Sequence, residues 1–259
     1  MYADHFGLRQ HIRHHTDVIS VTKTDDHATT GRWNVRCRDV STGEESSEVF
    51  GAVMACNGYQ SYPNIPKMEG LADFRGQVLH THDYRTAAGF ENKRVLVVGV
   101  GNSGGDCAVD VCRVTKQLFL STRQGTWVVG RLDQDGYPWD FNHLTRFRLF
   151  LQSKFTRPWE KYIEWKVNSK FNHANFRLKP PFGLFYGQPM INDDLPARML
   201  TGAIKIKTDV KRFTETGVEF VDGTTEELDA VILATGYKSE FPFLSQDVRV
   251  GLTNFFCHL

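Results

Sequence analysis

One stretch of this chain combines residue types and spacing that suit the binding of a phosphate group. After the apolar, β-branched run Val95–Val98, the sequence reads Gly99-Val-Gly101-Asn-Ser-Gly104, which fits the pattern GxGxxG. The first glycine of this pattern makes a tight turn, the second lets backbone N–H groups approach a pyrophosphate, and the third lets helix and strand pack closely. The positive end of the following helix then faces the phosphate charge. We therefore predict a dinucleotide site formed by Gly99, Gly101, Asn102, Ser103 and Gly104.

The neighbouring sequence distinguishes this interpretation from an ordinary glycine-rich turn. A lone GxGxxG is weak evidence, because such turns are common. Here a buried-type strand precedes the glycines, residues 105–114 are compatible with a helix, and Gln117–Ser121 reads as a second strand. The order strand, turn, helix and strand favours a nucleotide-binding βαβ unit.

The end of the second strand indicates which dinucleotide is bound. NAD sites usually carry Asp or Glu about 20 residues after the glycines, where it accepts from the ribose 2′-hydroxyl. This strand instead ends in Ser121, Thr122 and Arg123, with no carboxylate. A guanidinium and two hydroxyls suit a 2′-phosphate, whereas the alternative is a solvated arginine at a strand end. We predict NADPH as the cofactor at this site.

Composition excludes several other classes of protein. The chain has 259 residues, 41% of them hydrophobic, and a formal charge of +1, so no attraction to nucleic acid is expected. Its five cysteines include no CxxC pair, which fits a reducing compartment and argues against a disulfide framework. His11, His14 and His15 have no carboxylate or cysteine at ligand spacing, so we predict no metal site. No apolar run approaches the ~18 residues of a membrane helix.

Two parts of the chain repeat one pattern. Thr16-Asp-Val is echoed by Thr208-Asp-Val, and GAVMACNGY at residues 51–59 by DAVILATGY at residues 229–237. Each copy reads as a β-meander that ends in a buried strand, and in the first copy we expect strands at Val18–Thr22, Trp33–Arg38 and Glu48–Cys56. Only the second copy follows a GxGxxG turn. We expect the full protein to carry a second dinucleotide unit ahead of the first copy.

The segment between the copies carries a family resemblance. Phe74, Gly76, His80 and Tyr84 fill the pattern FxGxxxHxxx(Y/F) shortly before a GxGxSG turn. This combination resembles the identifying motif of the flavin-containing monooxygenases. Further segments resemble the family at Ser121–Arg123, Gly136–Pro138, Asn192–Pro196 and Ala234–Tyr237. Baeyer–Villiger monooxygenases are also similar, but they usually have Trp at the position of Tyr84, which favours the amine- and sulfide-oxidising branch.

The resemblance implies a fold and a domain arrangement. The fold class is α/β, with a Rossmann-like NADPH-binding domain inserted into an incomplete FAD-binding domain with β-meanders. Residues 1–70 would be the partial FAD domain, 71–207 the NADPH domain, and 208–259 the second meander and the return to the FAD domain. Residues 126–189 form an aromatic-rich insertion in which Arg157–Lys170 reads as a helix. Its aromatic stripe, with Trp159 and Tyr162, is more often core than substrate pocket.

The implied activity is an NADPH- and FAD-dependent monooxygenation. One atom of O2 would be transferred to a tertiary amine or a sulfide through a flavin C4a-hydroperoxide. The flavin makes the new bond, so we expect no catalytic acid, base or nucleophile from the protein. The resemblance also assigns cofactor binding to Asn57 and Gly58 in the first copy and to Thr235 and Gly236 in the second.

Several expectations concern the chain as a whole. The resemblance implies a full-length protein at the cytosolic face of the endoplasmic reticulum membrane, where many members of the family carry a C-terminal hydrophobic anchor that this sequence does not show. We therefore expect a fragment or short form that is soluble in the cytoplasm by itself, with its oligomeric state open. Two alternatives are a non-catalytic NADP-binding module and a two-site reductase that uses Cys107 and Cys112, spaced as CxxxxC. The second is disfavoured, because positions i and i+5 of a helix point to different faces.

Overall fold

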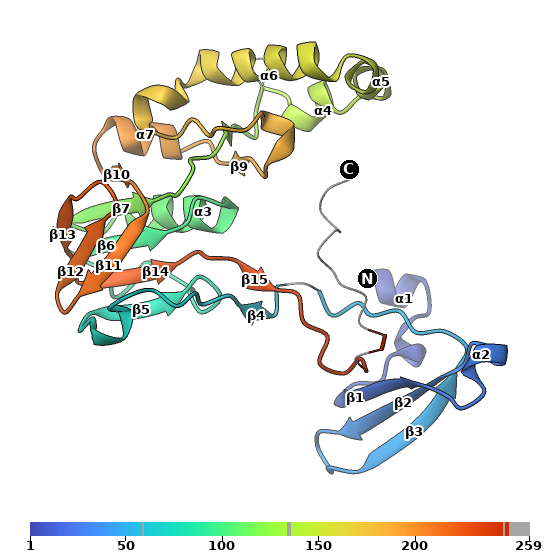
Figure 1. Ribbon diagram of the computed structural model, residues 1–259. Helices are drawn as coiled ribbons and strands as arrows, with labels where there is room; N and C mark the ends of the chain where they lie inside the picture. The colour runs from blue at the N-terminus through green and yellow to red at the C-terminus, as the bar shows by residue number, and fades with distance from the viewer. Residues whose placement is uncertain (59, 134–135, 246, 249–259) are drawn as a thin grey trace. The chain divides into compact units, whose positions relative to one another are not determined.

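The computed structural model describes residues 1–58, 60–133, 136–245 and 247–248. The chain forms two compact units, one made of Met1–Tyr62 and the residues from Tyr237 onward, the other of Pro63–Gly236. It passes between them at the short strands β4 (Tyr62–Pro63) and β15 (Tyr237–Lys238) (Figure 1). These units divide the chain differently from the predicted segments 1–70, 71–207 and 208–259, because the second meander packs within the central unit.

The first unit contains the first meander as a three-stranded antiparallel sheet in the order β1-β2-β3. Val21 of β1 and Val35 of β2 are buried, whereas β3 is exposed along its length. The strands predicted at Val18–Thr22 and Trp33–Arg38 are confirmed. The elements of this unit are α1 (Tyr2–His5), the 3₁₀ turn η1 (Arg9–His11), β1 (Thr16–Lys23), α2 (His27–Thr30), β2 (Trp33–Asp39) and β3 (Glu45–Phe50).

The third strand predicted in this meander is wrong in its second half. We expected Glu48–Cys56, but β3 ends at Phe50, and residues 51–58 are exposed and lie in no strand. The equivalent run in the second copy, Ala230–Leu233, forms a strand because it lies between two parallel neighbours that bury it. Residues 51–58 have no such neighbours in the described part of the chain. Tyr59, the last residue of this copy, lies outside the described residues.

The central unit is built on a five-stranded parallel sheet in the order β10-β7-β6-β14-β5. The strand predicted at Gln117–Ser121 is confirmed, and the apolar run Val95–Val98 forms the middle strand. The helix predicted at residues 105–114 begins earlier, inside the glycine-rich turn. The elements are η2 (Leu71–Asp73), β5 (Gln77–His80), β6 (Arg94–Val98), α3 (Asn102–Val111), β7 (Gln117–Ser121), β10 (Ile204–Lys207) and β14 (Ala230–Leu233).

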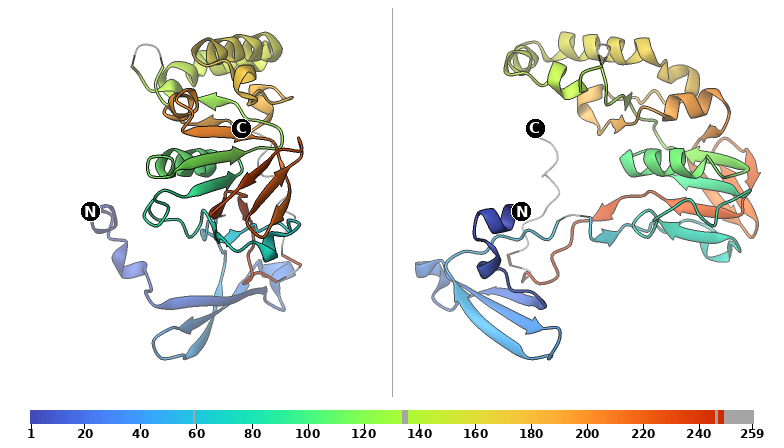
Figure 2. Two further views of the ribbon diagram at one scale, coloured as in Figure 1. Left: turned by 90° about the vertical axis from the view of Figure 1, so that its left-hand side faces the viewer. Right: turned by 180° about the vertical axis from the view of Figure 1, so that it is seen from behind.

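Each face of this sheet carries its own apolar core, because successive side chains of a strand point to opposite sides. Val95 and Val97 of β6 pack in the core on the side of α3, and Leu96 and Val98 pack in the core on the side of the second meander. Figure 2 shows these layers from two further directions. The meander consists of β11 (Val210–Thr214), β12 (Gly217–Phe220) and β13 (Thr225–Glu227), and α7 (Leu195–Leu200) joins α3 on the other face.

The aromatic-rich insertion between β7 and β10 is mainly helical. The predicted helix is confirmed as α6, and its Ile163 and Val167 pack with Trp127 in a third apolar core, against which Trp159 lies. The predicted core role fails for Tyr162, which is 47% exposed. No helix in the described ranges is long and apolar enough to cross a membrane. The insertion comprises β8 (Val128–Val129), α4 (Trp139–His143), α5 (Arg146–Lys154), α6 (Thr156–Lys170), η3 (His173–Phe176), η4 (Leu184–Tyr186) and β9 (Met190–Ile191).

His173 makes the stability of the folded chain depend on pH. Its side chain is fully buried, and Nε2 accepts from the Val128 N–H at 2.8 Å while Nδ1 lies 2.8 Å from the Asn168 Oδ1. Burial lowers the pKa of His173 to about 4. The unfolded chain therefore binds a proton that the folded chain does not, and stability falls as pH drops from about 6.5 towards 4.

We expect urea denaturation to show a free energy of unfolding lower by on the order of 3 kcal/mol at pH 4 than at pH 7 from this group alone. His173→Gln keeps an acceptor for Val128 but cannot titrate, so its stability should depend less on pH than that of the wild type. The same pH dependence in both proteins would contradict the assignment.

Candidate nucleotide-binding site

The glycine-rich turn lies between β6 and α3, and its three glycines meet different surroundings. Gly99 has φ +111°, and a Cβ there would lie 2.5 Å from the Ala234 carbonyl oxygen. A Cβ on Gly104 would collide with the carbonyl oxygen of Gly99. A Cβ on Gly101 would meet nothing within 4 Å. Internal packing thus requires the first and third glycines, whereas the second borders open space.

Gly101 is also the N-cap residue of α3, and no side chain among the described residues caps this helix end. The first N–H groups of a helix have no partner within the helix. An uncapped N-terminus that faces open space is a site for an anion, and the helix dipole favours negative charge there. This arrangement fits the pyrophosphate that the sequence predicts.

A cleft of about 580 Å³ opens beside the turn at the carboxyl ends of the parallel strands. It lies where the chain order changes direction, because β7 and β10 follow β6 on one side and β14 lies on the other. Nucleotides bind at this point in open α/β sheets. The lining includes Val98–Val100 after β6, Ser121–Gly125 after β7, Ala234 and Thr235 after β14, the loop residues Asn64 and Pro66–Glu69, Phe182, and Asp209–Lys211.

The three residues predicted to hold the 2′-phosphate have different surroundings. The Ser121 hydroxyl is buried and donates to the Thr208 carbonyl at 2.8 Å, and the Thr122 hydroxyl accepts from the Gly125 N–H at 2.9 Å. Arg123 is exposed, lines the cleft, and has no ion pair within the ranges that the structure describes. The Arg123 guanidinium and the Thr122 hydroxyl therefore keep their donors for a ligand, whereas the Ser121 hydroxyl donates within the protein.

Two lysines join Arg123 at the cleft and were missed by sequence reasoning. Lys67 precedes β5 in the chain, and Lys211 lies on the second meander, where it pairs with Glu219 at 2.6 Å. Lys67, Arg123 and Lys211 outnumber the two carboxylates of the lining, Glu69 and Asp209. Neither lysine belongs to a local motif, so only the fold identifies them.

The other residues of the predicted turn differ in their surroundings. The Asn102 side chain is used within the protein, where its Oδ1 accepts from the Ile191 N–H of β9 at 2.7 Å. Ser103 is exposed on the first turn of α3. Asn102 therefore joins the nucleotide turn to the insertion, and Ser103 is free to face a ligand.

Thr235 and Gly236, at the end of β14, are tied to Asn64. The Thr235 hydroxyl donates to the Asn64 carbonyl at 2.5 Å, and the Asn64 N–H donates to the Gly236 carbonyl at 2.9 Å. Asn64 lies in a proline-rich stretch, and no sequence motif identifies it as part of the site. Asn57 and Gly58, the matching predicted pair, belong to the first unit, and both are exposed there.

The motif from Phe74 to Tyr84 runs through β5 and contacts α3. The Phe74 ring packs against Gly76, where a Cβ would also meet the Asp229 carbonyl oxygen at 2.6 Å. His80 is buried at the end of β5, its Nδ1 accepts from the His82 N–H at 3.0 Å, and burial lowers its pKa. The Tyr84 hydroxyl donates to the Asp110 carboxylate of α3 at 2.6 Å. The motif thus joins β5 to α3, the helix that follows the glycine-rich turn.

The cysteine pair considered for a reductase is unsuited to thiol chemistry. Cys107 and Cys112 are both buried, and no disulfide links them. Burial raises the pKa of Cys107 to about 12 and also raises that of Cys112. The reactive thiolate is therefore disfavoured at neutral pH.

The turn, the uncapped helix and the cleft at the switch point define a dinucleotide-binding α/β protein. Comparison of the sequence with protein families then identifies which kind. The sequence model of the family described as "Flavin-binding monooxygenase-like" matches residues 1–256. The chain therefore belongs to the flavin-binding monooxygenase-like family, which confirms the resemblance read from its motifs.

Relatives and solved structures agree with this assignment. The chain is 45% identical over 258 residues to human flavin-containing monooxygenase 2, covering 98% of the chain and 48% of the relative. It is 43% identical to human flavin-containing monooxygenase 5 over 254 residues, covering 96% of the chain and 47% of the relative. It thus spans about half the length of these relatives.

The solved structures confirm the predicted α/β fold class. The flavin-containing monooxygenase from Stenotrophomonas maltophilia aligns with a TM-score of 0.64 at 21% identity, covering 95% of this chain and 56% of that one. A cyclohexanone monooxygenase bound to ε-caprolactone aligns with a TM-score of 0.67 at 17% identity, covering 93% and 57%. Identities this low show the fold alone.

The different surroundings of Gly101 and Gly104 give a matched pair of variants. Gly104→Ala should lower the free energy of unfolding by about 2–4 kcal/mol, because its methyl group collides with backbone. Gly101→Ala should change it by less than about 1 kcal/mol, because the methyl group enters open space at an N-cap position. Denaturant titrations of both variants test this, and equal losses would contradict the geometry.

Proposed function

We propose that this chain carries the NADPH-binding part of a flavin-containing monooxygenase that transfers one oxygen atom of O2 to tertiary amines or sulfides. The observation that carries the proposal is the uncapped N-terminus of α3, where Gly101 borders open space beside a cleft of about 580 Å³. The names of relatives support the reaction class, among them macaque dimethylaniline monooxygenase [N-oxide-forming] 2, at 45% identity.

Different residues of the cleft would bind different parts of NADPH. The backbone of the Gly99–Gly104 turn would bind the pyrophosphate, and Arg123 would hold the 2′-phosphate with Lys67 and Lys211 adding positive charge nearby. Ser121 contributes by shaping the strand end that presents Arg123, since its hydroxyl donates to Thr208, whereas the Thr122 hydroxyl accepts from Gly125 and can still donate to the phosphate. When bound, NADPH supplies the hydride that reduces the flavin.

The residues present fit NADPH better than they fit FAD. A pyrophosphate of FAD would need its own glycine-rich turn, and the 259 residues contain one GxGxxG pattern, at Gly99–Gly104. We propose that chain beyond these residues supplies the other turn, and that Asn57, Gly58, Thr235 and Gly236 support the flavin side of the complete enzyme. Its place at the cytosolic face of the endoplasmic reticulum belongs to the same proposal.

A Baeyer–Villiger reaction is the second candidate. The fold does not separate the two reactions, since a cyclohexanone monooxygenase aligns as well as a flavin-containing monooxygenase does. Tyr84, at the position where Baeyer–Villiger monooxygenases usually have Trp, favours the amine- and sulfide-oxidising branch. A non-catalytic NADP-binding module would use the same cleft without any oxidation.

Arg123→Ala should weaken NADPH binding about tenfold to a hundredfold and leave NADH binding unchanged, because charge-assisted bonds to the 2′-phosphate contribute about 1.5–3 kcal/mol. Gly101→Ala should weaken both nucleotides, because its methyl group fills the space of the shared pyrophosphate. Calorimetric titration measures both affinities, with Arg146→Ala, an exposed arginine of α5, as the control. Equal losses for the two nucleotides in Arg123→Ala would contradict its role at the 2′-phosphate.

The second measurement is the absorbance spectrum of the purified chain, before and after addition of FAD and NADPH. We expect NADPH binding without stable flavin uptake, because one glycine-rich turn serves one dinucleotide. Oxygen consumption with and without a sulfide then separates an active enzyme from a binding module. Bound flavin that NADPH reduces would show that the chain alone completes both sites.

A further inference from the structure

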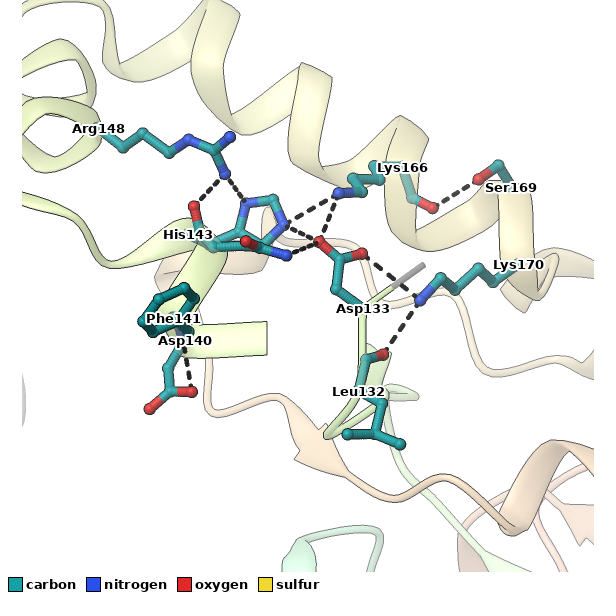
Figure 3. A network of polar contacts seen from close by, with 10 residues as sticks. Leu132, Asp133, Asp140, Phe141, His143, Arg148, Lys166, Ser169 and Lys170 are labelled. Atoms are coloured by element: carbon teal, nitrogen blue, oxygen red, sulfur yellow. Dashed lines mark hydrogen bonds and ion pairs between the residues drawn. The ribbon is translucent and has the colours of Figure 1, made fainter. Parts of the chain in front are cut away.

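A buried polar network outside the nucleotide cleft joins three parts of the insertion (Figure 3). Asp133 follows β8, and its carboxylate side chain is 3% exposed. Its Oδ2 accepts from the Asn142 side chain at 3.2 Å, lies 3.0 Å from His143 Nε2 and lies 2.8 Å from Lys166 Nζ. The network therefore links the end of α4 to the middle of α6 through a single carboxylate.

The contacts of His143 favour one neutral tautomer. Arg148 Nη1, which also donates to the Asn142 carbonyl, lies 3.3 Å from His143 Nδ1 and can only donate to that nitrogen. A ring proton on Nε2 is then donated to Asp133 Oδ2, although Lys166 Nζ lies 3.1 Å from the same nitrogen. The Trp139 ring stacks on the imidazole, with centroids 4.5 Å apart. Both nitrogens of the neutral ring are thus used, and among the described residues the group that faces Nδ1 is the Arg148 guanidinium, a donor.

The charges around the imidazole oppose a second proton. Lys166 Nζ of α6 lies 3.1 Å from His143 Nε2, and the Arg148 guanidinium of α5 faces the other nitrogen. Lys170, also of α6, lies 3.7 Å from Asp133 Oδ1, so the carboxylate already faces two ammonium groups. Burial lowers the pKa of His143, and Lys166 lowers it further, against the opposing effect of Asp133.

The element that depends on this network is short. α4 has five residues and no side-chain cap at its N-terminus, and Phe141 is 68% exposed. Its contacts with the rest of the insertion include the Trp139 N–H, which donates to the Arg131 carbonyl at 2.8 Å, and the side chains of Asn142 and His143 at Asp133. Trp139, Asp133 and Lys166 also line a cleft of about 220 Å³, so a movement of α4 would open that cleft.

We propose that His143 and Asp133 form a pH-sensitive latch that holds α4 against α6 at neutral pH and releases α4 when the imidazole takes up a proton. The added proton would lie on Nδ1 and point at the Arg148 guanidinium, whose Nη1 keeps the Asn142 carbonyl as its acceptor. Three cationic groups, His143, Lys166 and Lys170, would then face one carboxylate, with Arg148 beside them. Separation of α4 from α6 relieves both effects and lets water solvate the charges.

Hydrogen–deuterium exchange of the complete chain, corrected for intrinsic rates, tests the latch in a peptide that covers α4. Protection of this peptide should fall at least about tenfold between pH 7.5 and pH 5, with a midpoint below the usual histidine pKa of about 6.5. His143→Gln still donates to Asp133 but cannot titrate, so its α4 protection should not depend on pH.

Two lysines of α6 provide a matched comparison that does not require the His143 variant to fold. Lys166→Met removes a cation beside the imidazole and frees Asp133 to pair with it, so the midpoint should rise by about one pH unit. Lys161→Met changes an exposed lysine of the same helix and should leave the midpoint in place. Protection of α4 that is constant with pH, or equal midpoints in the two lysine variants, would overturn the latch.

Discussion

The close backbone contact between the β6–α3 turn and the end of β14 determines the geometry of the nucleotide cleft. Gly99 lies against the Ala234 carbonyl, and Gly104 lies against Gly99, so strand, turn and helix meet with no side chain between them. The N-terminus of α3 is thereby held beside the carboxyl ends of three parallel strands. Two apolar cores, one on each face of the sheet, keep these strands in place.

Sequence reasoning was sound where a local pattern determines the structure. The apolar runs at β6 and β7 predicted buried strands, and the glycine spacing predicted the turn, because both depend on neighbours in the chain. It was less successful where the partner is distant. The Ser121 hydroxyl was assigned to a ligand, but it donates to the Thr208 carbonyl, a contact that exists only once the sheet has formed, whereas the Thr122 hydroxyl accepts from Gly125 and keeps its own proton for a ligand.

The two meanders also show that distant partners decide whether a segment forms a strand. Their sequences are similar, yet Ala230–Leu233 forms a strand and residues 51–58 do not, since a strand needs neighbours to pair with. The insertion was the least predictable part, because two sets of contacts between distant residues hold it together. One is an apolar core around Ile163, and the other is a charged network around Asp133. Neither Asp133 nor Lys166 has a sequence signal, as they are 33 residues apart.

The hydrogen bond between Asn64 and Gly236 has a consequence for the central unit. It joins the second residue of this unit to its last, because the Asn64 N–H donates to the Gly236 carbonyl oxygen at 2.9 Å. A unit whose ends meet can be inserted into a loop of another protein without stretching that loop. The central unit is therefore a transplantable module, and the same closure makes it a suitable starting point for circular permutation.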